Sequence, residues 1–283
     1  MREAPRPVVD PALLNGTAAT RWTNLGWWDA PVGAGSPAQR ASYPDAARTL
    51  AQRVGEVAGL RAGDVVVDVA CGYGDSLALW VTAFGAARVV GVEPDPAVGA
   101  AVRARIAAWG LADRITVIPA TAETFALATH APDATAVVCV DAAYHFHTRA
   151  AWLRGVARAA APGTRLGFSD LAVTGAATRT LTAAEGVRPR GLRWGAARAG
   201  IPAENLWTLD GIPAAMGAAG YEAITVMECG GPVLDGFCAY ARRARGPWLR
   251  HPALGGWRAL ATAWLLGRVR PMLTMGCVGA RVR

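Results

Sequence analysis

Residues 65–75 read Val-Val-Val-Asp-Val-Ala-Cys-Gly-Tyr-Gly-Asp. A run of mostly β-branched residues carries the chain to Asp68, and Gly72 and Gly74 then interrupt it before a helix-compatible segment. This pattern predicts a buried strand, a glycine-containing turn and the start of a helix. In such an arrangement the backbone can approach a nucleotide-like ligand closely.

Strands and helices alternate on both sides of this stretch. The other segments predicted as strands are residues 88–93, 115–118, 136–140, 165–171, 221–227 and 272–282. Continuous apolar strands separated by helices are typical of a parallel sheet covered on both faces, and right-handed crossovers then make it doubly wound. We therefore predict an α/β fold with a seven-stranded, mostly parallel Rossmann-like sheet.

Changes in composition divide the chain into four predicted parts. They are an N-terminal arm over the site (1–42), a Rossmann-like core (43–171), an insertion or lid (172–220), and a sheet edge with a helical insertion (221–283). The arm is rich in Trp, Pro and Gly, which disfavours a regular helix. Its tryptophans either cover a site or simply pack on the core. Residues 174–202 show no strong periodicity.

The composition excludes several classes of protein. With 53% hydrophobic and 18% charged residues, the chain has ample material for a core and is not disordered. The net charge of +8 comes from dispersed arginines without any lysine, so we expect no nucleic-acid partner. Five separated cysteines indicate reduced thiols and no metal site. With neither a signal peptide nor about 18 consecutive apolar residues, we expect a cytoplasmic protein.

The residues around the glycine turn restrict the ligand. The next strand ends at Glu93, where a carboxylate can accept hydrogen bonds from both ribose hydroxyls. The third glycine of a dinucleotide site is missing after Gly74, and Asp75 places a negative charge where a pyrophosphate would lie. A P-loop is excluded because the chain has no lysine. These features favour a ligand with a ribose and a positive charge but no phosphates, and S-adenosylmethionine (SAM) meets these demands.

The stretch 67–74 resembles the first motif of class I SAM-dependent methyltransferases, with Ala70 in place of the first glycine of that motif. Residues 89–95, 115–123 and 137–141 resemble the motifs of the second, third and fourth strands, and order and spacing match over about residues 43–230. The resemblance implies SAM as the cofactor. The cofactor-binding residues that we assign on this basis are Asp68, Ala70, Gly72, Gly74, Glu93, Pro94, Ala122, Glu123 and Asp141.

The loop 141–149 follows the fourth predicted strand and should face the reaction centre. It resembles the small-molecule branch of the family, which methylates quinones, tocopherols, sterols and natural-product sugars. We assign His145 as the base for an acceptor hydroxyl because its unperturbed pKa suits neutral pH, with Tyr144 as a further catalytic candidate. Asp170, at the end of the fifth strand, is expected to orient the imidazole or hold the acceptor. His147 is interpreted as a surface residue near a helix start.

The predicted function is methyl transfer from SAM to a small-molecule acceptor, most simply a hydroxyl of a natural product or lipophilic metabolite, by in-line displacement. The alternatives are an NAD(P)-dependent oxidoreductase and a non-catalytic binding module on a methyltransferase fold. The C-terminal stretch combines Trp248, Trp257 and Trp264 with several arginines. It is interpreted either as core helices with solvated Arg edges or as a peripheral membrane contact.

Overall fold

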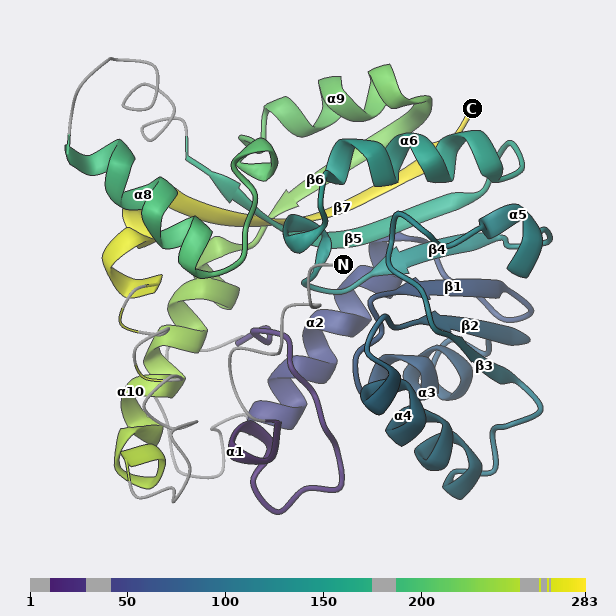
Figure 1. The fold of residues 1–283 in the computed structure, drawn as a ribbon, viewed down its shortest axis with the longest axis horizontal. Helices are drawn as coiled ribbons and strands as arrows, with labels where there is room; N and C mark the ends of the chain where they lie inside the picture. Colours follow the sequence, from purple (N-terminus) through teal and green to yellow (C-terminus); the bar gives the residue numbers. More distant parts are fainter. Residues whose placement is uncertain (1–10, 29–41, 175–186, 250–259, 261–263, 265) are drawn as a thin grey trace.

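A computed structural model gives the fold and describes residues 11–28, 42–174, 187–249, 260, 264 and 266–283. Its centre is a seven-stranded sheet in the order β3-β2-β1-β4-β5-β7-β6 (Figure 1). The strands are β1 (Val65–Val69), β2 (Arg88–Val92), β3 (Ile115–Ile118), β4 (Ala136–Cys139), β5 (Arg165–Val173), β6 (Tyr221–Glu228) and β7 (Leu273–Val282). The first five are parallel and β7 is antiparallel to both of its neighbours. The predicted α/β fold is confirmed.

The strand order reverses between β1 and β4, the two neighbours from which the chain winds outward in opposite directions. In an open α/β sheet, the loops that leave the carboxyl ends of two such strands diverge and leave a crevice. The glycine turn leaves β1 and the loop 141–149 leaves β4. The topology therefore brings the two candidate halves of the site together.

Helices cover both faces of the sheet. On one face lie α2 (Tyr43–Val57), α3 (Asp75–Thr82) and α4 (Pro96–Ala108), and on the other lie α5 (Leu127–His130), α6 (Arg149–Ala159) and α9 (Gly211–Ala219) (Figure 1). Each face buries its own apolar cluster. Three of the described helix starts carry side-chain caps: the Ser42 hydroxyl accepts from Asp45 N at 3.3 Å, the Asp95 carboxylate from Ala97 N at 2.8 Å, and the Thr148 hydroxyl from Ala151 N at 3.3 Å.

In the part of the chain that the structure describes, three helices lie beyond the carboxyl ends of the strands: α1 (Pro11–Asn15), α8 (Val187–Arg198) and α10 (Gly236–Leu249) (Figure 1). Helix α8 lies within residues 174–202, where the sequence shows no strong periodicity and no helix was predicted. Half of the twelve residues of α8 are Arg or Gly, so it lacks the apolar stripe that predicts a helix. It is instead held by packing, with Ala196 buried in an apolar cluster together with Ile201. The described part of the arm begins with the five-residue α1, so the arm is not wholly irregular.

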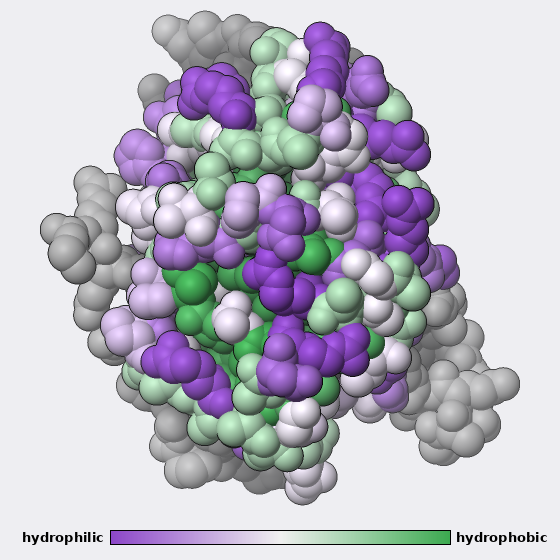
Figure 2. Space-filling view, turned by 90° about the vertical axis from the view of Figure 1, so that its right-hand side faces the viewer, coloured by the Kyte–Doolittle hydropathy of each residue, from purple (hydrophilic) through white to green (hydrophobic). Residues whose placement is uncertain are grey.

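Figure 2 shows the opposite edge, where the parallel strands begin; hydrophobic residues are visible in its middle between hydrophilic ones. Ion pairs lie at this edge: Arg165 pairs with Asp64, and Arg88 pairs with Asp133. Among the described residues, no helix is both long and apolar enough to cross a bilayer. Much of the C-terminal stretch that carries Trp248, Trp257 and Trp264, including Trp257, lies outside the described residues.

Candidate active site

A pocket opens at the carboxyl ends of β1 and β4. Three segments line it: residues 21–24 of the arm, residues 68 and 70–76 in and after β1, and Val140 after β4. Four of the predicted cofactor-binding residues therefore share one pocket, namely Asp68, Ala70, Gly72 and Gly74. Residues 21–24 of the arm form one of its walls.

The glycine turn has a backbone that favours glycine. Ala70, Gly72 and Gly74 have φ angles of +63°, +53° and +83°, in the left-handed region. A non-glycine residue there costs about 1–2 kcal/mol. Ala70 thus adopts a left-handed conformation at the position where the resembling motif has glycine. At Gly74 a Cβ atom would lie 2.7 Å from Val102 Cγ1 on α4, so the turn packs too closely for a side chain.

Asp68 supplies a buried carboxylate to this pocket. Its Oδ2 accepts a hydrogen bond from Trp80 Nε1 at 2.7 Å, and its residue is 1% exposed. Burial raises its pKa from 3.8 to about 6, although hydrogen bonds from Ser76 and Trp80 oppose the shift. A cation bound next to it would favour the ionised form and be held by it.

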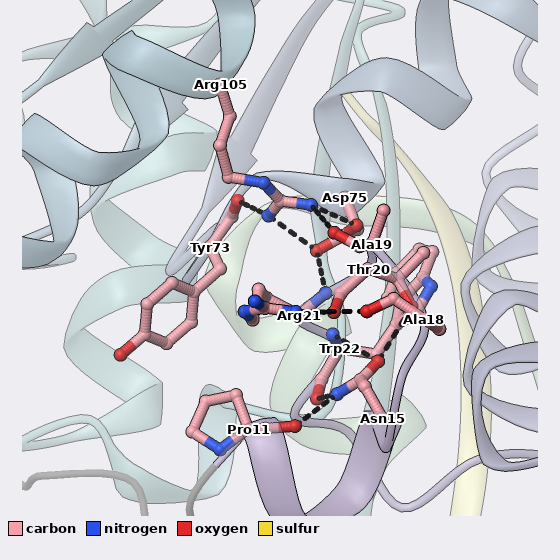
Figure 3. A network of polar contacts seen from close by, with 10 residues as sticks. All are labelled: Pro11, Asn15, Ala18, Ala19, Thr20, Arg21, Trp22, Tyr73, Asp75 and Arg105. Carbon is pink, nitrogen blue, oxygen red and sulfur yellow. Dashed lines mark hydrogen bonds and ion pairs between the residues drawn. The ribbon is translucent and has the colours of Figure 1, made fainter.

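Asp75 does not carry the free negative charge that the sequence suggested. Arg105 on α4 pairs with both carboxylate oxygens, at 2.7 Å from Nη2 to Oδ1 and 2.9 Å from Nη1 to Oδ2. Arg105 also donates to the carbonyls of Tyr73 and Ala19, and Arg21 N donates to Asp75 Oδ2 at 3.0 Å (Figure 3). Arg105 thus neutralises the charge of Asp75, so Asp75 is no longer evidence against a ligand with phosphates. The missing third glycine still argues against a dinucleotide site.

Three other predicted cofactor-binding residues lie along the same sheet edge but do not line this pocket: Glu93, Ala122 and Glu123. Glu93 follows β2, its Oε1 accepts from Asp95 N at 2.9 Å, and burial raises its pKa. Pro94, next to it, is also outside the lining. Glu123 is exposed, and its Oε1 accepts from His147 N at 2.8 Å, which ties the loop after β3 to the loop after β4.

Asp141 holds the arm in place. Its Oδ2 accepts from Leu25 N at 2.7 Å, and its Oδ1 accepts from the Tyr144 hydroxyl at 2.8 Å. Its backbone is left-handed, with φ of +56°, and burial raises its pKa to about 7. Since Asp75 binds Arg21 N, carboxylates from the two loops fix both ends of the arm segment that forms the pocket wall. The sequence did not reveal this role.

His145 has a defined hydrogen bond. Its Nδ1 lies 3.3 Å from the carbonyl oxygen of Gly200, after α8. A carbonyl only accepts, so Nδ1 must carry the proton, which leaves the lone pair on Nε2 when the ring is neutral. Burial lowers the pKa of His145 and so favours this neutral form. The ring of Tyr144 is close, with centroids 4.4 Å apart, whereas His147 is exposed.

Asp170 is not hydrogen-bonded to His145, so the first of its two expected roles, orienting the imidazole directly, is wrong. The strand β5 continues to Val173, so Asp170 lies inside it, fully buried, and pairs with Arg149 at the start of α6. Arg149 Nη2 also donates to the Asn205 carbonyl at 2.8 Å, and burial lowers the Arg149 pKa to about 9. Sequence reasoning missed Arg149 and Asn205, because only the fold brings these residues to Asp170.

Comparison with known proteins agrees with this geometry. The family described as "Methyltransferase domain" matches residues 66–163. Erythromycin 3''-O-methyltransferase of Saccharopolyspora erythraea is 26% identical over 241 residues, covering 83% of this chain and 70% of that protein. Among solved structures, the [4+2]-cyclase SpnF has a TM-score of 0.72 at 20% identity, covering 95% of this chain and 92% of SpnF.

A SAM-dependent methyltransferase from Geobacter sulfurreducens in complex with S-adenosyl-L-homocysteine has a TM-score of 0.64 at 20% identity, with both chains fully covered. At these identities the two solved structures support the fold alone. The pocket fits SAM: Asp68 offers a carboxylate to a cation, and the turn lets the backbone approach. Residues 66–163 form a methyltransferase domain, and together with the curated relative and this pocket they indicate a SAM-dependent methyltransferase with SAM as its cofactor.

Proposed function

We propose that this enzyme transfers the methyl group of SAM to a hydroxyl of a natural product or another lipophilic metabolite. The proposal rests on the hydrogen bond of the His145 imidazole. Its Nδ1 is hydrogen-bonded to the Gly200 carbonyl oxygen, which leaves the lone pair of Nε2 to act as the base. Burial, by lowering its pKa, keeps this base neutral and available at neutral pH.

Apolar side chains next to this loop support a lipophilic acceptor. Tyr144, Leu171, Val173 and Ile201 belong to one buried cluster at the carboxyl end of β5 and the amino end of the antiparallel β7. An acceptor with an apolar body would bury its surface there and place a hydroxyl near His145. The resemblance to an erythromycin O-methyltransferase favours the same acceptor class.

The proposed reaction is an in-line displacement. SAM supplies a methyl group activated by its sulfonium. The acceptor oxygen forms a bond to the methyl carbon, the carbon–sulfur bond breaks, and its electron pair neutralises the sulfonium. His145 Nε2 takes the hydroxyl proton and releases it to solvent. Exclusion of water and alignment contribute the rest of the acceleration.

We assign the chain's contacts to the cofactor as follows. Asp68 faces the positive charge, the turn 70–74 approaches through its backbone, and Glu93 accepts from the ribose hydroxyls. Pro94, Ala122 and Glu123 border the adenine. Asp141 acts through the arm, because its carboxylate holds Leu25.

The test compares two histidines of one loop. The wild-type enzyme is incubated with SAM and a panel of hydroxylated macrolides, glycosides and phenols, and S-adenosylhomocysteine release and product mass are measured. We expect His145→Gln to lower kcat by about 10²–10⁴-fold, the usual contribution of a general base, because the hydroxyl proton has no acceptor. The exposed His147→Gln should stay near wild type. Full activity of His145→Gln, or no methylated product from any hydroxyl, would refute the proposal.

The location of the enzyme remains a prediction. We propose that it works in the cytoplasm and meets its acceptor there. Contact with a membrane through the C-terminal Trp/Arg stretch is a further proposal; Trp264 is 63% exposed, and Arg268 lies 5.1 Å from its ring centroid. Cosedimentation with anionic lipid vesicles tests it, and Trp264→Ser should reduce binding.

A further inference from the structure

Asn205 binds the backbone on both sides of His145. It ends the short helix η3 (Ala203–Asn205) and is 1% exposed. Its Nδ2 donates to the carbonyls of Tyr144 at 3.1 Å and Phe146 at 2.7 Å. These two residues flank His145, so a single side-chain amide holds the backbone carbonyls of the residues before and after the base.

The orientation of this amide is itself fixed. Its Oδ1 accepts from Arg149 N at 2.9 Å, and the Asn205 carbonyl accepts from Arg149 Nη2 at 2.8 Å. The guanidinium of Arg149 lies 4.1 Å from the ring centroid of Trp207 and pairs with Asp170. Because carbonyls only accept, the NH₂ group must face Tyr144 and Phe146, and the reversed amide would lose all three side-chain bonds.

The same segment also contacts the imidazole. Gly200, five residues before Asn205, presents its carbonyl to His145 Nδ1. The segment 200–205 therefore holds the base twice, at its ring through Gly200 and at its backbone through Asn205. Its position is set by Asp170 on β5 through Arg149.

We propose that Asn205 is a positioning residue for His145: it fixes the backbone so that Nδ1 meets Gly200 and Nε2 faces the acceptor. The inference rests on the proposed role of His145 as the base. It gives Asp170 an indirect part, since Asp170 anchors Arg149 and not the imidazole.

The buried charges that support Asn205 are better explained by positioning than by stability. Within the described residues, Arg149 Nε and Asp170 Oδ1 are buried without a hydrogen-bond partner. Leaving buried polar atoms unpaired costs free energy, and buried ion pairs are often no more stabilising than apolar packing. Such a network fixes a unique geometry instead, here that of the loop carrying His145.

The arm offers a matched control. Asn15 is also buried, its Nδ2 donates to the carbonyls of Pro11 at 2.8 Å and Trp22 at 2.9 Å, and its Oδ1 accepts from Trp22 N at 3.1 Å (Figure 3). Asn205→Ala and Asn15→Ala therefore remove the same kinds of hydrogen bond from the acceptor side and the cofactor side. A general loss of stability should be similar in both variants.

The measurement is the NMR spectrum of the histidine rings, which reports tautomer and pKa. The chain has only four histidines, and His145→Gln and His147→Gln assign the signals. In Asn205→Ala we expect His145 to lose the Nδ1-protonated form and its pKa to rise toward 6.5. The acidic limb of the kcat profile should move with it, and kcat should fall at least about tenfold with SAM affinity unchanged, as expected for a misplaced reacting group. Asn15→Ala should alter SAM affinity and leave the His145 signals unchanged.

An unchanged His145 tautomer, pKa and kcat profile in Asn205→Ala, with a lower melting temperature alone, would overturn the inference. If that variant does not fold, Asn205→Gln keeps the amide one methylene further out and should shift the His145 signals in the same direction by less; unchanged signals there would also overturn it. The NMR result is independent of whether His145 is the base. Failure of the proposed function would instead appear as full activity of His145→Gln.

Discussion

The loops after β1 and β4 are the two halves of the proposed site, and they are held in place in different ways. The loop after β1 is shaped by its own backbone, through three left-handed residues within 70–74. The loop after β4 is held by side chains from distant parts of the chain. Asn205 binds it directly at the carbonyls of Tyr144 and Phe146, 61 and 59 residues away, and Asp170 acts through Arg149, 21 residues away. Cofactor binding thus depends on a local motif, whereas acceptor chemistry depends on the assembled fold.

This difference predicts that the halves can be damaged separately. Changes in the loop after β1 should weaken SAM binding and leave the chemistry intact at saturating SAM. Changes in the network around Asn205 should do the reverse. Three substitutions on the cofactor side test this separation.

Asp68→Asn should have the largest effect on the cofactor. It keeps the acceptor for Trp80 Nε1 but removes the charge that faces the cation, and losing a charged contact of about 1.5–3 kcal/mol weakens SAM binding about 10–100-fold. Titration calorimetry at pH 8 measures it. In the wild type, SAM affinity should fall as the pH drops through about 6, where Asp68 takes up a proton.

The stability of Asp68→Asn should change in the opposite direction. Burial raises the folded pKa of Asp68 above its ordinary 3.8, so the folded state binds more protons between about pH 4 and 6, and stability from this group falls as the pH rises through that window. Asn avoids the buried charge, so the melting temperature at pH 8 should rise. A lower melting temperature with unchanged SAM affinity would contradict both expectations.

Gly74→Ala should weaken SAM binding about tenfold, because its Cβ meets Val102 at 2.7 Å and displaces the turn. Gly163→Ala is the control: its φ of +82° nearly equals the +83° of Gly74, but a Cβ there meets no atom within 4 Å. Both variants should lose about 1–2 kcal/mol of stability from backbone strain. Equal SAM affinities in the two would show that the close packing of the turn is irrelevant.

Arg105→Met should have the smallest effect. It removes the ion pair with Asp75 and the contacts to the Tyr73 and Ala19 carbonyls, so the arm is held less firmly and SAM should dissociate a few-fold faster in stopped-flow measurements. Arg88→Met, which breaks the exposed pair with Asp133 at the opposite edge, is the control. Equal dissociation rates in both variants would rule out the arm contact as a barrier.

The difference between the two loops also explains which features of the fold and the site could be predicted from the sequence. Runs of β-branched residues and the glycine turn are local signals, so the strands, the pocket at Asp68 and the cofactor class were predictable. Most strand ends were predictable to within one or two residues, as at β1 and β2. Helix α8 was not, because packing and not periodicity stabilises it.

The acceptor side was only partly predictable for the same reason. His145 and Tyr144 follow a strand directly, which is a local signal. The partner of Asp170 was misjudged because β5 runs two residues further than its apolar pattern indicated, and nothing in the spacing pairs it with Arg149. Asn205 follows an irregular stretch of sequence, and its side chain contacts the carbonyls of Tyr144 and Phe146 only in the folded chain. Its role therefore could not be predicted from the sequence.

The most direct test of the separation is the SAM dissociation constant of His145→Gln, measured by calorimetry beside its rate of methyl transfer. We expect a dissociation constant within about twofold of wild type and a transfer rate lower by about 10²-fold or more. If SAM binding is lost together with transfer, the loop after β4 belongs to the cofactor site and the two halves are not separable. If transfer persists, His145 is not the base.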